Sequence, residues 1–215
     1  QKWGGVNMRD VYDFAKFFIK NGIDSVPNTF DGNMKLQKML VLADMSYIAQ
    51  YKKPLFEEDV LAFRNGLVVE KVRLRYKNDY YGLKKDSEQF NPDFSENEYE
   101  ILKAVIGVYG HLSAKQLSEL SHVFKSWNSG YHIKEKSVVD FDVYPEDIEA
   151  VRRVIAAYKE TIKNPSKYEV INGVIFYYDN MIMTDELISD LEEFSKKCED
   201  DAYTVYEEDG RLVIY

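Results

Sequence analysis

The chain has 215 residues, of which 45% are hydrophobic and 14% aromatic, enough to bury a core of its own. Its single cysteine excludes an intramolecular disulfide and a cysteine-based zinc site, and suits a reducing compartment. No apolar run approaches the roughly 20 residues that span a bilayer, and no signal peptide is recognisable, so we expect a cytoplasmic protein without a membrane role.

The net charge of −9 is confined to the end of the chain. Residues 166–215 contain 13 acidic and 4 basic residues, whereas residues 1–165 contain 24 of each sign. An acidic segment is repelled by phosphate backbones and attracted to basic protein surfaces, so the charge argues against DNA binding. An acidic surface that only keeps the protein soluble explains the same pattern equally well.

Two helices are predicted in the first quarter of the chain. Residues 11–20 repeat apolar side chains at helical spacing. Residues 35–50 are apolar around more than half of a helix circumference, which predicts a central helix covered on most sides. The start of this helix nevertheless carries Lys35, Gln37 and Lys38. These side chains either fix a neighbouring loop or face a partner, and we favour the structural role.

A tight turn is predicted after the central helix. Asn65 and Gly66 form the residue pair that best tolerates a positive φ. We therefore expect a short strand or extended piece that enters this turn, and a helix that begins near Val68.

Three further helices are predicted from their first turns. Pro145 stands at a favoured first helical position, and Asn164 with Pro165 should end the helix that it begins. Between Trp127 and Pro145 the pattern weakens and no element is predicted. The other two helices begin at capping boxes, in which two side chains satisfy free backbone donors; the boxes are Ser95 with Glu98 and Ser113 with Gln116.

The tail has a β-β-α-β-β pattern. Strand-forming residues flank the turn pairs Asn172–Gly173 and Asp209–Gly210, and a helical segment lies between the two hairpins. We therefore predict an α+β chain with two parts. The first is a mainly helical domain of residues 8–164 with a short hairpin or extended element, and the second is a small acidic β-β-α-β-β module of residues 165–215.

No combination of side chains indicates catalysis. The three histidines lack the spacing of a zinc site, so we expect neither a metal nor a cofactor. Ser121 and His122 are adjacent on a helix and point about 100° apart, and Glu192 with Glu193 fits a solvated face better than a hydrolytic pair. No glycine-rich phosphate loop is present. We therefore expect a protein that is not an enzyme, whose 17 tyrosines serve its core or an interface.

Four motifs follow one another along the first part of the chain. They are KLQKMLVLADMSYIAQ at residues 35–50, PLF at 54–56, AFRNGLVVEKV at 62–72 and EILKAVIGVYGHLSAKQLSELSH at 100–122, followed by Trp127. In this order they resemble the Panacea domain, also called the SocA-like or phage-associated GepA family, over residues 8–160. The chain departs from the family pattern at Phe63, Leu67, Ser121 and Ser126, where the family has Trp, Pro, Thr and Pro. These departures affect the geometry of the turn more than the fold.

The resemblance implies an antitoxin. Family members commonly sit beside a toxin gene, often in phages or prophages, and neutralise toxins of unrelated folds. We therefore expect a cognate protein toxin as the partner, encoded by the adjacent gene and inhibited by direct binding. The acidic module would cover a basic active site on a toxin that handles nucleotide or RNA. Two alternatives stay open: an adaptor that delivers a bound protein to a protease, and an enzyme with an unrecognised site around His122.

Nine residues are predicted to contact the partner. Four of them lie in the motifs without being obvious core residues, although turn formation and packing explain them equally well. The other five belong to the acidic tail. The set is Arg64, Asn65, His122, Trp127, Tyr177, Tyr178, Glu192, Tyr203 and Tyr206.

Overall fold

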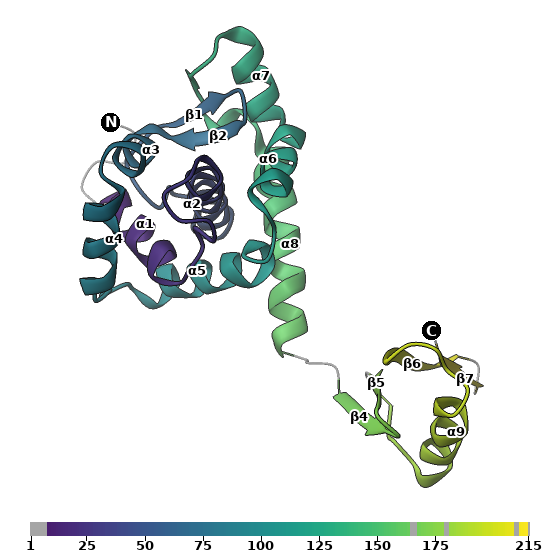
Figure 1. Cartoon of the computed structure of the whole chain (residues 1–215). Helices are drawn as coiled ribbons and strands as arrows, with labels where there is room; N and C mark the ends of the chain where they lie inside the picture. The colour runs from purple at the N-terminus through teal and green to yellow at the C-terminus, as the bar shows by residue number, and fades with distance from the viewer. Residues whose placement is uncertain (1–7, 164–166, 179–180, 209–210, 215) are drawn as a thin grey trace. The chain divides into compact units, whose positions relative to one another are not determined.

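The computed structural model describes residues 8–163, 167–178, 181–208 and 211–214, and this part of the chain is mainly helical (Figure 1). The chain divides into a helical unit, residues 1–158, and a C-terminal unit, residues 159–215, each with its own buried apolar cluster. The predicted α+β fold class is confirmed. The predicted domain boundary at residues 164 and 165 lies outside the described residues. None of the described helices is long and apolar enough to cross a membrane.

The central helix of the helical unit is α2 (Phe30–Tyr51), which Figure 1 shows surrounded by other elements of this unit. Its side chains are buried along most of its length, as predicted. It begins five residues earlier than predicted, because the Thr29 hydroxyl accepts a hydrogen bond from the Gly32 amide at 3.0 Å and caps it there. Its helical neighbours include α1 (Val11–Lys20), α5 (Glu96–Tyr109) and α6 (Ala114–Val123).

A β-hairpin follows α2, as the turn signal predicts. The two residues of the turn are Arg64 and Asn65, one position earlier than predicted, and the positive φ of +97° falls on Gly66. A third short strand pairs with the first, which makes a three-stranded sheet of order β2-β1-β3. The strands are β1 (Val60–Phe63), β2 (Gly66–Val69) and β3 (Ser137–Val138).

Two helices follow the hairpin where one is predicted. α3 (Glu70–Asn78) begins two residues later than expected because β2 continues to Val69. The sequence does not predict α4 (Tyr80–Gln89). Its buried side chains are a tyrosine, a leucine and a serine, so its apolar pattern is too weak to recognise.

Both predicted capping boxes are present at the starts of α5 and α6. The sequence does not predict α7 (Lys125–Ile133), because the side chain of its N-cap residue, Phe124, makes no cap. Instead Asp147, in the first turn of α8 (Pro145–Lys163), accepts hydrogen bonds from the first two amides of α7 at 3.1 and 2.8 Å. α8 begins at the predicted residue, whereas its predicted end at residues 164–165 lies outside the described residues. The 3-10 helix η1 (Phe141–Val143) precedes it.

The C-terminal unit folds as the predicted β-β-α-β-β module. Its two central strands are parallel, the other neighbours are antiparallel, and α9 packs on one face of the sheet (Figure 1). Asn172 and Gly173 have φ of +51° and +86°, which confirms the first predicted turn, whereas residues 209–210 lie outside the described residues. The elements are β4 (Lys167–Ile171), β5 (Val174–Tyr178), α9 (Asp185–Ser195), β6 (Ala202–Glu208) and β7 (Arg211–Ile214), with the strands in that order.

Candidate functional site

Three polar side chains in the first half of α2 hold backbone groups of the helical unit. Lys38 Nζ donates a hydrogen bond to the Leu67 carbonyl at 2.8 Å, and Gln37 Oε1 accepts one from the Val69 amide at 3.0 Å. Lys35 Nζ donates to a carbonyl at the end of α5 at 2.7 Å. All three side chains are buried. The structural role favoured for them is therefore confirmed, and two of them fix β2.

Side chains from α6 and α7 hold the same hairpin from another side. Ser121 Oγ accepts a hydrogen bond from the Leu67 amide at 2.9 Å. Trp127 Nε1 donates to the Phe63 carbonyl at 2.7 Å. The motif residues of the Panacea resemblance thus meet at one place. There, side chains of α2, α6 and α7 form hydrogen bonds with the backbone of the two strands beside the turn.

His122 and Trp127, two of the predicted partner residues, lie beside this hairpin. Their rings stack with centroids 4.0 Å apart, and the Tyr131 ring also stacks on the Trp127 indole, at a centroid distance of 5.4 Å. The pKa of His122 is lowered. Burial is the main cause and the Lys38 charge adds to it, while a hydrogen bond with the Arg64 backbone acts in the opposite direction. The Ser121 hydroxyl anchors β2 through the Leu67 amide, and His122 packs against Trp127. Ser121 is buried and His122 and Trp127 are half-buried, so partner contact through His122 and Trp127 stays a prediction.

Replacing Trp127 with phenylalanine should lower the stability of the helical unit while keeping an aromatic ring in the stack. The Phe63 carbonyl would lose its donor, at a cost of about 1–2 kcal/mol in unfolding free energy. Thermal unfolding should show a melting temperature lower by about 2–8 °C. Tyr131→Phe, which also keeps its ring, is the matched control and should melt like the wild type. Equal melting temperatures for both variants would contradict the role of the indole N–H.

A pocket of about 480 Å³ lies beside the hairpin turn, between this turn, the start of α2 and α3. Lys38, Arg64, Arg73 and Lys77 bring four basic side chains to its lining, against one acidic side chain, Glu135. Arg73 Nε is buried without a hydrogen-bond partner. The lining can therefore receive an anionic or hydrogen-bond-accepting group.

Two predicted partner residues, Arg64 and Asn65, lie at this pocket and are exposed. Their backbone is fixed, since Ser118 Oγ donates a hydrogen bond to the Asn65 carbonyl at 3.1 Å. The sequence alone does not single out Phe30 or Arg73, which also line the pocket. Arg73 belongs to a run of basic residues in α3, but which side chains of this helix face the pocket depends on how α3 packs.

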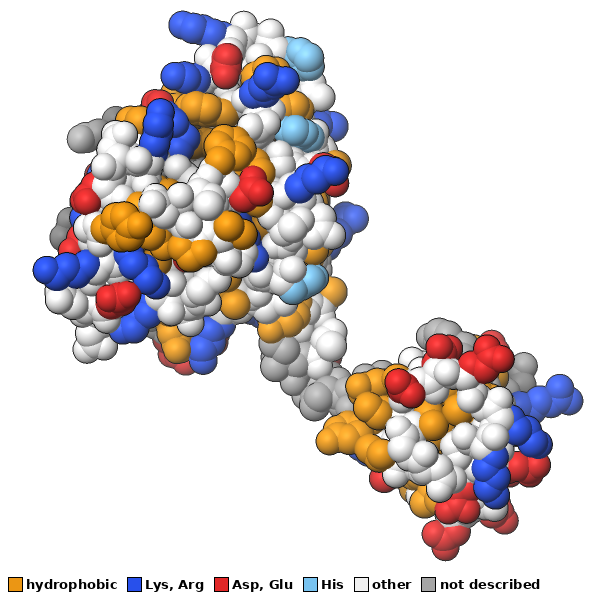
Figure 2. All heavy atoms as spheres, in the orientation of Figure 1, with side chains coloured by type: hydrophobic (Ala, Val, Ile, Leu, Met, Phe, Trp, Pro, Cys, Tyr) orange, Lys and Arg blue, Asp and Glu red, His pale blue; other side chains and the backbone are white. Residues whose placement is uncertain are grey.

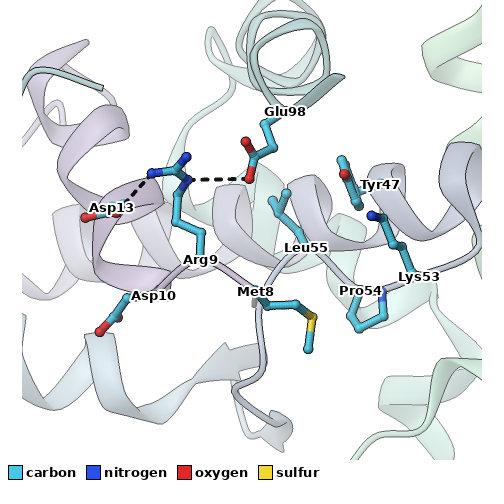
Figure 3. Close-up of a pocket in the computed structure, with 9 residues that line it drawn as sticks. All are labelled: Met8, Arg9, Asp10, Asp13, Tyr47, Lys53, Pro54, Leu55 and Glu98. Atoms are coloured by element: carbon cyan, nitrogen blue, oxygen red, sulfur yellow. Dashed lines mark hydrogen bonds and ion pairs between the residues drawn. The ribbon is translucent and has the colours of Figure 1, made fainter. Parts of the chain in front are cut away.

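A second pocket, also of about 480 Å³, lies where the start of α1 meets α2, α5 and the segment after α2 (Figure 3). Figure 3 shows the Arg9 guanidinium between Asp13 and Glu98, with an ion-pair distance of 3.5 Å to each. Arg9 also pairs with Asp93 at 2.6 Å. These ion pairs link the start of α1 to α5, and the carboxylates compensate the positive charge of Arg9. We therefore assign this pocket a structural role.

The five predicted partner residues of the C-terminal unit fall on different surfaces. Tyr177 and Tyr206 are exposed on the sheet face that points away from α9. Tyr178 and Tyr203 lie on the face that α9 covers, where the first is buried and the second half-buried. Glu192 is exposed on α9. The alternation of strand residues separates the tyrosines, so they do not form a single contact surface.

In the helical unit, residues of the sequence motifs thus meet at one hairpin turn, which α2, α6 and α7 hold by hydrogen bonds and beside which the basic pocket lies. Residues 36–128, from α2 to α7, match the family model described as antitoxin SocA-like, Panacea domain. This part of the chain is therefore similar to the Panacea domain of SocA-like antitoxins, and the resemblance drawn from the motifs is confirmed. No curated protein and no solved structure matches the chain. Among the described residues, no group of three His, Cys, Asp or Glu side chains is placed to hold a metal.

Proposed function

We propose that this chain is an antitoxin that neutralises a cognate protein toxin by binding it directly. The observation that carries the proposal is the match of residues 36–128 to the SocA-like antitoxin family. On the gene arrangement that the family resemblance implies, the toxin is the product of the adjacent gene, and the two proteins meet in the cytoplasm. Inhibition is then stoichiometric and requires no catalytic group.

Two surfaces suit contact with such a toxin. Residues 166–215 carry all of the net charge of −9, so the C-terminal unit is attracted to a basic active site on a toxin that handles nucleotide or RNA. Within the Panacea domain, the pocket with Arg64 and Asn65 at its lining offers a second place for contact. The first surface supplies charge attraction and the second a shaped cavity.

Expression of the adjacent open reading frame in a bacterial host should arrest growth, and co-expression of this chain should restore it. Direct binding further requires that the two proteins co-purify as a stable complex whose toxin content stays constant with time. Loss of the toxin over time would instead indicate an adaptor that delivers it to a protease. Persistent arrest would contradict an antitoxin role.

Deletion of residues 166–215 in the same assay should abolish protection. The helical unit has its own buried cluster, which includes Val151 and Ile155 of α8, so the shortened protein should remain folded. Circular dichroism and a cooperative thermal transition check that it does. Full protection by the shortened protein would show that the Panacea domain alone neutralises the toxin.

A further inference from the structure

The sheet of the C-terminal unit has one face that α9 does not cover. α9 packs over the opposite face, where Phe176 and Val205 are fully buried. Successive residues of a strand point to opposite faces, and residues paired across strands share a face. The pairing register therefore brings a second set of side chains together, called the open face below. It includes Tyr168, Val170, Ile175, Tyr177, Thr204 and Tyr206.

The open face is apolar and accessible. Tyr168 is 61% exposed, Val170 58% and Tyr177 40%, and the two tyrosine rings lie 6.2 Å apart. None of these six side chains carries a charge, and the charged residues that the same register places on the open face, Glu208 and Arg211, stand opposite each other at one end of β6 and β7. Figure 2 shows hydrophobic side chains gathered on one side of the C-terminal unit, with acidic side chains elsewhere on its visible surface. Contiguous exposed apolar surface of this kind marks an interaction site, and tyrosine is enriched at such sites.

Acidic side chains stand at both ends of the central strand β6. Asp200 and Asp201 precede it, and Glu208 ends it opposite Arg211; all four side chains are exposed, and three of them are acidic. An apolar centre with a charged rim has the layout of a protein-protein interface. The sign of the rim selects a partner that is basic around its own apolar centre.

The charge also disfavours other occupants of the open face. A second copy of the chain would bring two acidic units, each with net charge −9 over residues 166–215, into contact. Nucleic acid is repelled for the same reason.

We propose that the open face docks onto the toxin, at an apolar patch of the toxin surface that is ringed by lysine and arginine side chains. This inference rests on the proposed function and specifies which surface of the C-terminal unit makes the contact. The apolar residues supply most of the binding energy by leaving water, and the acidic rim speeds association and orients the two proteins.

The test uses the full chain, the product of the adjacent gene as the probe, and three lysine substitutions. Val170→Lys and Tyr168→Lys place a cation on the open face, against the basic rim of the toxin. Ile182→Lys is the matched control, because Ile182 is 83% exposed but lies outside the sheet, and the change in net charge is identical. Titration calorimetry should show binding at least about tenfold weaker for each open-face variant and unchanged for the control. All three variants should keep the wild-type melting temperature, since the replaced side chains are exposed.

The outcomes separate this inference from the proposed function. If the wild type and all three variants bind the toxin equally and restore growth, the open face is not the docking surface and the antitoxin role stands. If the wild type neither binds nor protects, the antitoxin role fails and the inference falls with it. A concentration-dependent dimer of the wild type that Val170→Lys dissolves would assign the face to a second copy and overturn the inference.

Discussion

Replacing Gly66 with alanine is expected to lower the unfolding free energy of the helical unit by roughly 3 kcal/mol or more. Gly66 has φ of +97°, which a residue with a side chain adopts only under strain. A Cβ atom there would also lie 2.5 Å from Ser121 Oγ and 2.8 Å from Lys38 Nζ, two groups that anchor the hairpin. The substitution therefore combines backbone strain with displacement of the groups that hold Leu67.

Thermal unfolding of Gly66→Ala should show a melting temperature lower by about 6–12 °C. Gly173→Ala in the C-terminal unit is the matched control, since its φ is +86° but nothing lies within 4 Å of a Cβ atom there. It carries the strain alone and should cost about 1–2 kcal/mol. Equal losses at the two glycines would show that the close approach of α2 and α6 to the turn contributes nothing.

The elements that the sequence predicts well carry their signals within a few residues. Ser95 and Ser113 cap α5 and α6 in reciprocal pairs with Glu98 and Gln116, three positions away, so both helix starts could be read directly. The start of α7 depends on Asp147, which lies 21 and 22 residues along the chain from the amides that it caps. A cap supplied from another helix leaves no local trace, so α7 could not be predicted.

The candidate site could be predicted only in part, for a similar physical reason. Lys35 and Lys38 in the first half of α2 could be assigned a structural role because they are flanked by side chains that must be buried. Strand alternation could also have placed Tyr177 and Tyr178 on opposite faces of the sheet. Which of the two faces α9 covers, and hence which tyrosine is exposed, depends on tertiary packing.

Two buried ionisable groups in the helical unit should give its stability opposite dependences on pH. Burial raises the pKa of Asp44 from 3.8 to about 7, while the hydrogen bond from the Leu55 amide lowers it. Burial lowers the pKa of Lys38 from 10.5 to about 7. Between pH 4 and 7 the folded protein holds a proton on Asp44 that the unfolded chain has released, so stability falls as the pH rises. Between pH 7 and 10 the unfolded chain holds a proton on Lys38 that the folded protein has released, so stability rises with pH.

The contribution of these two groups to stability should therefore have a minimum near pH 7. Asp44→Asn and Lys38→Met isolate the two parts, because subtracting each variant's unfolding free energy from that of the wild type cancels the groups that they share. The difference for Asp44→Asn should fall from pH 4 to 7 by up to about 1.4 kcal/mol per pH unit, and the difference for Lys38→Met should rise at a similar rate from pH 7 to 10. Urea unfolding at each pH measures both. A flat difference for Lys38→Met would mean that the lysine stays charged in the folded protein, with the Leu67 carbonyl compensating for its burial.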